Sequence, residues 1–471
     1  MRSATFAVPA TVSALVAATA LLTTAAPPAQ AAVSTPGPIS AVSAKPGPYA
    51  GQVTFSWTAT GANTTSFVIE TGLTTFKVGD PTLPDHGRRA TYFTVPGNRR
   101  SVTLSAAQVA SAGAPVGSAN HLYYRFKAVH TTAYGTAVRA WPSLQNVPVK
   151  PATPAGGGVG LRVATYNVHT ATPSAGVRPW LTRVPGVAKT ILSRNPGVVG
   201  LQELGIGRAD GGSTPAMGTT LTQIRSLLDT LRAQGGGRYQ LVRSTRFVAP
   251  GTPEAIQGAR ILYDTTRYRL ASACPERSDS LPLSDNSWSS SCTVLLPTLA
   301  GDSAWTKRRA SYAVLADRAS GRSFYVVAAH LDQRHSTTPS VERTYEQLRA
   351  TQVRTVLARI DQLNTGKLPV VLAGDLNTYQ NNQGGYDAHD ALIAGGYYDT
   401  AAATTQVNVR FTTMNHFYCT LAVPGSGWGS RLDVVAVKGV RGAPRWENVM
   451  TTTDCARPSD HNLVVADLRL P

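Results

Sequence analysis

Cysteine, acidic residues and long apolar runs are all scarce in this chain of 471 residues. It has four Cys, and none of them forms the C-x-x-C spacing that structural zinc sites use, which argues against a zinc site. After the N-terminal region, no segment is apolar over the roughly 20 residues that a membrane-spanning helix needs. No internal repeat or long low-complexity tract occurs. The sequence therefore predicts globular domains without a membrane-spanning segment.

Acidic residues number only 26, against 44 Lys or Arg, which gives a formal net charge of +18 at pH 7. This imbalance favours an acidic partner, whether nucleic acid, anionic lipid or cell-wall polymer. The charge does not choose among these partners, and a role in solubility alone is the competing explanation.

The first 31 residues have the features of a secretory signal peptide. Arg2 precedes an apolar stretch, and Ala29-Gln30-Ala31 suits cleavage before Ala32. A retained membrane anchor is the alternative, but the apolar stretch is short and is diluted by Thr and Ser. The mature protein is therefore expected to be secreted to the extracellular space.

The four cysteines fit an oxidising compartment, where disulfides persist. Three pairings are possible. The most local one joins Cys274 to Cys292 and Cys419 to Cys455. The sequence leaves the pairing open.

Residues 33–150 contain short alternating apolar runs separated by Gly, Pro and Asn, a pattern typical of an all-β sandwich. Trp57 lies in an early run, VTFSW, and YYRFKAVH forms a late one. With these features the segment resembles a fibronectin type III domain, which has an immunoglobulin-like fold. The resemblance implies a spacer or attachment module. Its ten Lys or Arg against three acidic residues also suit contact with a cell-wall polymer or another polyanion.

A linker is predicted at residues 151–160, which are rich in Pro and Gly. A second domain is expected over residues 161–471, where β-type runs such as LRVATYNV alternate with helical stretches. The longest predicted helix covers residues 341–362, with apolar residues at three- and four-residue steps. Strongly apolar strands that alternate with helices indicate buried sheets covered by helices.

Six apolar strands of the second domain end or begin at side chains that bind metal ions or move protons. A turn is the ordinary explanation for any one of these residues, but six such positions in one domain are hard to explain as turns. The residues are Asn167, Glu203, His330 with Asp332, Asp375 with Asn377, Asp433, and Asp460 with His461.

These positions lie in the motifs TYNVHT, VVGLQEL, AAHLD, VVLAGDLN, RLDVVAV and PSDHNLVVADL, in that order. The motifs and their order resemble the endonuclease/exonuclease/phosphatase family, which includes deoxyribonuclease I, apurinic endonucleases, bacterial sphingomyelinases and inositol polyphosphate phosphatases. The resemblance covers about residues 161–471. It implies an α/β fold of four layers, the deoxyribonuclease I-like sandwich, with helices facing two central sheets and the site at one edge.

Phosphodiester hydrolysis explains why such a site needs both carboxylates and a metal ion. The phosphate repels an incoming hydroxide, and a hard divalent cation offsets this repulsion and the charge of the transition state. Mg²⁺ prefers oxygen ligands and keeps several waters, so few protein ligands suffice. Glu203 is the predicted principal ligand, assisted by Asn167 and Asp460. Mn²⁺ and Ca²⁺ are the alternatives to Mg²⁺.

The resemblance implies catalytic roles for five further side chains. Asp375 orients or deprotonates the attacking water, and the Asn377 amide donates to a phosphate oxygen. His461 contacts the phosphate, and Asp433 is expected to bind the far side of its imidazole and to favour its protonated form. His330 is expected to face the phosphate from the opposite side.

The motifs do not identify a carboxylate partner for His330. Glu254 and Gln257 lie shortly before the strand ARILYD, and Asp332 is an alternative that suits a turn better. His169 and His335 are near the motifs, but a solvent-exposed or locally hydrogen-bonded role is expected for both.

The preferred hypothesis is a secreted, monomeric, metal-dependent nuclease of low sequence specificity. In the second domain 29 of the 33 Lys or Arg are Arg, whose planar fork matches phosphate oxygens, although a high genomic G+C content would also enrich Arg. Lys307-Arg308-Arg309 and Arg334 are the expected contacts with a nucleic-acid backbone. The alternatives are a phospholipid-headgroup phosphodiesterase of the sphingomyelinase type, an inositol-phosphate phosphatase, and a non-catalytic adhesion protein.

Overall fold

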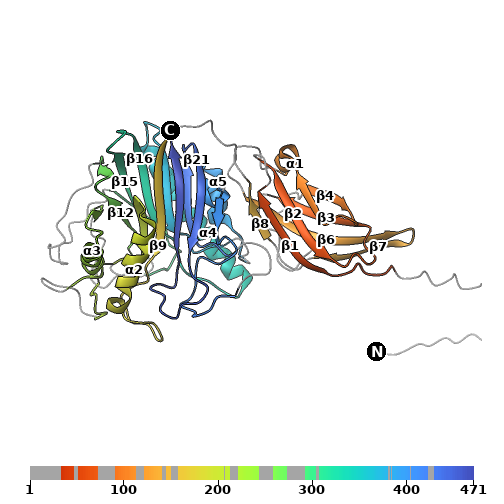
Figure 1. Cartoon of the computed structure of the whole chain (residues 1–471), viewed down its shortest axis with the longest axis horizontal. Helices are drawn as coiled ribbons and strands as arrows, with labels where there is room; N and C mark the ends of the chain where they lie inside the picture. Colours follow the sequence, from red (N-terminus) through yellow and green to blue (C-terminus); the bar gives the residue numbers. More distant parts are fainter. Residues whose placement is uncertain are drawn as a thin grey trace, which may run out of the picture.

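The structure is a computed structural model of the chain (Figure 1). The predicted signal peptide and most of the predicted linker lie outside the residues that it describes, as do Cys274, Glu254 and Gln257. The described residues are 33–46, 51–72, 91–112, 121–140, 145–149, 158–205, 207–212, 221–242, 258–272, 292–303, 307–379, 382, 384–403, 405–422 and 429–471.

Two antiparallel sheets form the N-terminal region, followed in the chain by the larger α/β region (Figure 1). The first sheet has the order β1 (Ile39–Pro46), β2 (Val53–Ala59) and β5 (Ser101–Leu104), and the short helix α1 (Ala106–Ser111) follows it. The second has the order β4 (Thr91–Pro96), β3 (Ser66–Gly72), β6 (His121–Thr132) and β7 (Gly135–Ala140), and β8 (Gln145–Pro148) also pairs with β6.

Aromatic side chains from both N-terminal sheets pack between them. The Trp57 ring lies 5.1 Å from the Phe67 ring and 4.7 Å from the Phe126 ring, measured between centroids. Aromatic pairs at such distances contribute packing energy beyond their buried area. The region is therefore all-β apart from α1 in its described residues, as its alternating pattern predicts. Its likeness to fibronectin type III stays a prediction.

The α/β region contains two sheets of seven strands each. The first has the order β11 (Tyr239–Leu241), β12 (Arg260–Asp264), β10 (Val198–Gln202), β9 (Val159–Asn167), β22 (Leu463–Leu470), β21 (Gly442–Val449) and β19 (Thr405–Val407). The second has the order β13 (Tyr268–Leu270), β15 (Arg309–Asp317), β16 (Ser323–His330), β17 (Val370–Asp375), β20 (Asp433–Lys438) and β18 (Tyr398–Asp399), and β14 (Thr293–Leu295) pairs with β15.

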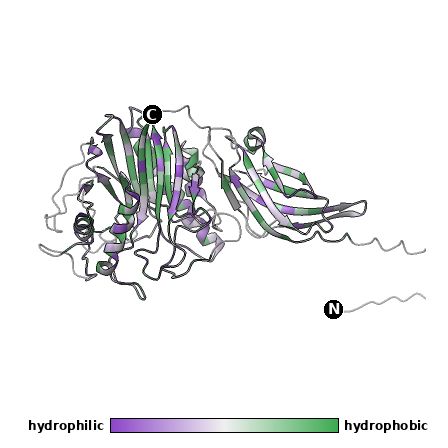
Figure 2. Ribbon diagram, in the orientation of Figure 1, coloured by the Kyte–Doolittle hydropathy of each residue, from purple (hydrophilic) through white to green (hydrophobic). Residues whose placement is uncertain are grey.

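Helices cover the outer faces of the two sheets and complete the predicted four layers. The helices α2 (Trp180–Arg194) and α3 (Gln223–Ala233) share an apolar core with the outer face of the first sheet. On the other side, α4 (Pro339–Leu363) and α5 (Asp387–Ala394) pack against the second sheet, and a 3₁₀ turn, η4 (Thr400–Ala402), follows them. Figure 2 shows the apolar residues concentrated on the central strands, where the two sheets face each other.

The apolar spacing of the sequence explains these elements. Helix α4 contains the predicted helix 341–362, and it buries Val353, Val356 and Ile360 at three- and four-residue steps. The strands β10 and β17 are buried at every position, as expected for strands between two layers. At Gly200, an added Cβ would lie 2.6 Å from the carbonyl oxygen of Ala373, so the glycine lets the two sheets approach closely near their polar edge.

One disulfide lies within the described residues, between Cys419 and Cys455, as in the most local pairing. It closes a loop that lies before β20 onto the segment between β21 and β22. Among the described helices, none combines the length and the apolar character needed to cross a membrane.

Candidate active site

In the first sheet, strand ends place three predicted site residues at one edge. β9 and β10 run parallel, so Asn167 and Gln202 are register partners, and Glu203 follows directly. β22 is antiparallel to β9, and His461 lies just before its first residue. Because parallel strands end at the same edge of a sheet and an antiparallel neighbour begins there, these side chains meet.

In the second sheet, strand direction likewise places the other predicted residues at one edge. Asp375 ends β17 and is the register partner of His330 on the parallel strand β16. It is also the partner of Asp433, the first residue of the antiparallel strand β20. Since the two sheets face each other, both groups lie at one edge of the sandwich, opposite the end at which β22 leads to the C-terminus (Figure 1).

The amide of Asn167 connects the two sheets. Its Nδ2 donates to Glu203 Oε1 at 3.1 Å and to Asp375 Oδ2 at 3.0 Å. Its Oδ1 accepts a hydrogen bond from the backbone amide of His169 at 3.0 Å. Asn167 is 1% exposed, so a single buried amide holds a carboxylate from each sheet.

Glu203 has the environment expected of a ligand for a hard cation. Its φ of 57° lies in the left-handed region, which is uncommon for residues other than Gly. Its Oε2 accepts a hydrogen bond from the backbone amide of Thr170 at 2.9 Å. Within the described residues, no Lys or Arg forms a salt bridge with Glu203 or Asp375. The printed hydrogen-bond donors to Glu203 are thus neutral amides, and a divalent cation with oxygen ligands fits its carboxylate, whereas Asp375 faces the imidazole of His461.

Asp375 lies at the centre of the cluster. Its Oδ2 is 3.7 Å from Nε2 of His330 and 3.7 Å from Nε2 of His461, and its Oδ1 accepts from the backbone amide of Asn377 at 2.9 Å. Burial raises the pKa of the Asp375 carboxyl, His461 opposes this shift, and Asp433 adds to it. A carboxylate with a raised pKa is a stronger proton acceptor than an exposed one.

His461 and Asp433 form the predicted pair. The imidazole Nδ1 is 2.8 Å from Asp433 Oδ2, and both side chains are buried. Burial alone would lower the pKa of His461, but Asp433 and Asp375 raise it well above its usual value. The imidazole therefore holds its proton at neutral pH. Asp375, Asp433 and His461 place ligand atoms within 4.8 Å of one another, but the hydrogen-bonded pair explains this grouping without a metal ion.

Asp460 pairs with His169, which the sequence did not place in the cluster. Asp460 Oδ2 is 3.2 Å from His169 Nδ1. Burial raises the pKa of Asp460, but the hydrogen bond from His169 and the charge of His461 lower it below its usual value overall. Asp460 therefore stays ionised at this edge. A solvent-exposed or locally hydrogen-bonded role was expected for His169, but its partner is a predicted site residue from a distant part of the chain.

Asn377 and His330 complete the predicted set. Nδ2 of Asn377 donates to the carbonyl of Leu331 at 3.0 Å, which fixes the amide beside Asp375. His330 is 2% exposed. The remaining candidate partner of His330 is engaged elsewhere, because the Asp332 carboxylate accepts from Arg334 at 2.7 Å and so belongs to the turn.

Sequence comparison agrees with this geometry. Residues 164–461, more than half of the chain, match the Endonuclease/Exonuclease/phosphatase family. The chain belongs to this family. Hydrolases of this family act on phosphoester bonds and generally depend on a divalent metal ion. No curated protein matches the sequence.

Solved structures of the family resemble the chain over its C-terminal two thirds. An endonuclease/exonuclease/phosphatase from Bacteroides vulgatus is 21% identical, covers 66% of this chain and 100% of its own, and gives a TM-score of 0.47. A family protein from Bacteroides thetaiotaomicron is 20% identical, covers 67% of this chain and 100% of its own, and gives a TM-score of 0.47. A mannosyl-6-phosphatase from the same organism is 21% identical, covers 65% of this chain and 99% of its own, and gives a TM-score of 0.44.

Arg183 is a buried residue of the family domain that sequence reasoning missed. Its guanidinium donates to the carbonyls of Val168 at 3.0 Å, Pro458 at 2.8 Å and Thr170 at 2.8 Å. Burial lowers its pKa to about 10, although Asp460 opposes the shift. Arg183 thereby joins the loop after β9 to the loop before β22, both of which carry site residues. The only sequence signal was its place one helical turn after Trp180, on the buried face of α2.

Several other expected contacts have local partners. Arg334 binds Asp302 at 2.8 Å as well as Asp332, so two carboxylates hold this predicted backbone contact. Arg308 is buried, which makes it a poor surface contact. His335 lies 3.1 Å from Glu342, in the local role expected for it.

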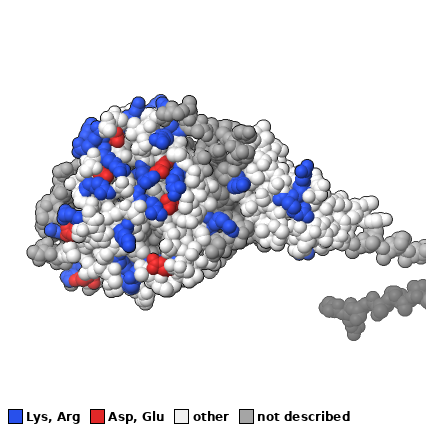
Figure 3. Space-filling model, in the orientation of Figure 1, with Lys and Arg blue, Asp and Glu red and all other residues white. Residues whose placement is uncertain are grey.

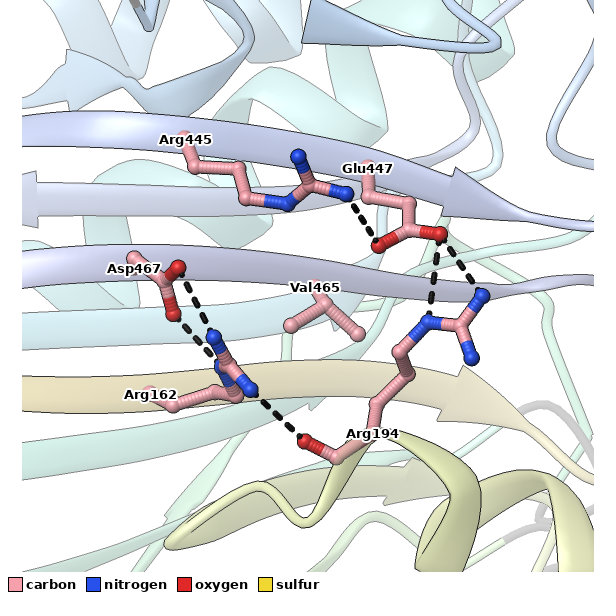
Figure 4. A pocket seen from close by; sticks show the side chains of 6 residues that line it. All are labelled: Arg162, Arg194, Arg445, Glu447, Val465 and Asp467. Carbon is pink, nitrogen blue, oxygen red and sulfur yellow. Dashed lines mark hydrogen bonds and ion pairs between the residues drawn. The ribbon is translucent and has the colours of Figure 1, made fainter. Parts of the chain in front are cut away.

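A separate hollow of about 270 Å³ lies on the outer face of the first sheet, over β9, β21 and β22 (Figure 4). We call it the arginine groove. Arg162 pairs with Asp467 at 2.6 Å, and Arg194 and Arg445 pair with Glu447 at 2.8 and 3.0 Å. Figure 3 shows Lys and Arg gathered over this face, with acidic side chains among them. No predicted site residue lines the groove. Its lining is Arg162, Arg194, Arg445, Glu447, Val465 and Asp467.

Proposed function

We propose that the protein is a secreted, metal-dependent phosphodiester hydrolase that acts on nucleic acid with low sequence specificity. The observation that carries the proposal is the surroundings of Asp375. One carboxylate oxygen has two imidazoles at 3.7 Å and the Asn167 amide at 3.0 Å, and the same amide holds Glu203. A base, two imidazoles and a further carboxylate around one point can supply the proton transfer and the metal ligand that phosphodiester hydrolysis uses.

Glu203 would hold the divalent cation, with Asp460 near it. Asn167 faces Glu203 with its Nδ2, so it would assist by fixing this carboxylate, because its Oδ1 accepts from the amide of His169. The bound ion, Mg²⁺ or alternatively Mn²⁺ or Ca²⁺, would supply positive charge against the phosphate oxygens. The oxygen donors suit such hard cations. The ionised state of Asp460 and the two neutral amide donors at Glu203 support this assignment.

Asp375 orients the attacking water and accepts its proton. Its raised pKa suits it to this role, and its position at the end of β17 holds it rigidly. His461, protonated through Asp433, donates a hydrogen bond to the phosphate or its leaving oxygen. His330 faces the same carboxylate from the neighbouring strand, and the Asn377 amide donates to a phosphate oxygen.

Nucleic acid is the proposed substrate because the family domain uses Arg for nearly all of its cationic residues. Binding that depends mainly on phosphate contacts should weaken steeply as salt rises. Export is supported by the signal-like first 31 residues and by the Cys419–Cys455 disulfide. The all-β region would act as a spacer or attachment domain, with limits near residues 33 and 150.

Parallel assays with three substrates test the proposal. The full chain would be incubated with plasmid DNA, sphingomyelin vesicles and inositol phosphates, each with Mg²⁺ and each with a chelator. We expect nicked and degraded DNA only with the metal, and Glu203→Gln should need at least about tenfold more metal for half-maximal rate. Product from lipid or inositol phosphate without DNA cleavage would reassign the substrate. No product from any of the three would favour a non-catalytic adhesion protein.

A further inference from the structure

A loop around residues 414–420 borders the candidate site next to His461. Met414 forms an isolated β-bridge with His461. The backbone amides of Asn415 and His416 both donate to the carbonyl of Asp460, at 2.5 and 3.1 Å. These contacts place the loop directly against the residues that would meet the phosphate.

The tip of this loop has an unfavourable backbone that its surroundings maintain. His416 and Phe417 are consecutive and both have a positive φ, 55° and 58°. Residues other than Gly rarely adopt this conformation, and it persists only where the rest of the structure enforces it. Phe417 contributes by packing inward, with its ring centroid 5.1 Å from that of His169 and 5.7 Å from the Arg183 guanidinium.

Three contacts fix the far side of the loop. The Cys419–Cys455 disulfide closes it. Arg457 Nε donates to the carbonyl of Tyr418 at 2.5 Å, and the amide of Leu421 donates to the carbonyl of Thr452 at 2.8 Å. The loop is therefore held on both sides.

This fixed loop presents two aromatic rings to solvent. Tyr418 is 61% exposed, and His416 is also exposed. Their ring centroids lie 5.3 Å apart with 33° between the planes. A rigid loop that exposes two adjacent rings next to a site offers a surface on which a base could stack.

We propose that His416 and Tyr418 form a stacking subsite for the nucleobase adjacent to the phosphate. The inference rests on the proposed function. It adds that the site would bind a nucleobase of the substrate as well as the phosphate. Every base has a π face, so stacking on these rings would bind substrate without reading its sequence, in agreement with low sequence specificity. A quaternary ammonium headgroup prefers a surrounding cage of rings, whereas these two rings offer an open surface.

The test compares two single-stranded oligonucleotides of equal length, oligothymidylate and an oligomer of abasic sugar phosphates. Both contain the same phosphodiesters, so their kcat/KM ratio isolates the base. With Mg²⁺ we expect the parent to prefer oligothymidylate by about tenfold, in the range of single-base stacking. Tyr418→Ala and His416→Ala should lower this ratio toward one, mainly through KM. Tyr418→Phe, which keeps the ring, should preserve it.

Tyr134→Ala is the matched control, because Tyr134 is 69% exposed and lies in the N-terminal region. Thermal unfolding would confirm that the variants are folded. If the parent cleaves both oligomers and folded Tyr418→Ala leaves their ratio unchanged, the subsite is wrong and the proposed function stands. If the parent cleaves neither oligomer but hydrolyses sphingomyelin or inositol phosphate, the substrate assignment and the subsite both fail.

Discussion

The candidate active site and the arginine groove are both rich in charge, yet their charges are arranged in opposite ways. In the groove, each carboxylate has arginine partners, and Glu447 alone binds Arg194 and Arg445. In the site, Glu203 and Asp375 share one amide donor, and within the described residues neither has a salt bridge with Lys or Arg.

The difference indicates which charges are structural. Partly exposed pairs that satisfy each other stabilise a surface modestly and leave little capacity for chemistry. Asp375 is buried without a Lys or Arg partner among the described residues, and burial raises its pKa, a kind of shift that is common at functional sites.

Replacing the central carboxylate should give the largest effect. Asp375→Asn removes the proposed base while keeping the shape, so we expect kcat on DNA to fall by about 1,000-fold or more. The groove supplies the control, because Asp467→Asn should leave kcat within about twofold. A similar loss of kcat in both variants, with folding intact by circular dichroism, would show that the carboxylates of the site and of the groove do not differ in function.

Removing the partner of the imidazole should have the next largest effect. Asp433→Asn takes away the negative charge that raises the pKa of His461, so the imidazole would lose its proton at lower pH. We expect activity to fall by about 10- to 100-fold, and the alkaline limb of the kcat/KM profile to move to lower pH. An unchanged profile would show that Asp433 does not act through His461.

A buried and an exposed arginine offer a comparison of stability. Arg183→Met leaves several buried carbonyls without their donor and should lower the free energy of unfolding by about 3 kcal/mol. Arg194→Met removes a partly exposed ion pair and should cost about 1 kcal/mol or less. Urea unfolding of both variants would measure the difference. Equal costs would mean that Arg183 does not hold the two loops together.

The smallest effect is expected from the groove carboxylate. Burial opposes ionisation of Glu447, but the hydrogen bonds from Arg194 and Arg445 lower its pKa below its usual value. Glu447→Gln should therefore reduce stability at neutral pH by about 1 kcal/mol, with activity within about twofold. A lowered folded-state pKa gives stability that is present above the unfolded-state pKa and is lost as pH falls through the folded value. The difference from the parent should thus disappear in acid, and a constant difference down to pH 3 would contradict this explanation.

Much of the site could be predicted because its reactive side chains lie at the ends of apolar strands. The motifs around Asn167, Glu203, Asp375 and His461 each follow or precede an apolar run, and strand register then brings them together. The Asp433–His461 pair was predicted from the resemblance to the family, and its two atoms lie 2.8 Å apart. Arg183 could not be found by this reasoning, because its partners are backbone carbonyls, which every residue has.

The sequence by itself determined the family, the alternation of strands and helices, and the residue types at the edge, since local apolar periodicity and short motifs specify all of these. Only the tertiary structure decided which carboxylates have no Lys or Arg partner within the described residues, that Asp460 bonds to His169, and that a disulfide-closed loop, bridged to His461 at Met414, exposes Tyr418. The physical reason is that pairing, burial and pKa depend on distances between segments far apart in the chain, and sequence spacing does not contain those distances.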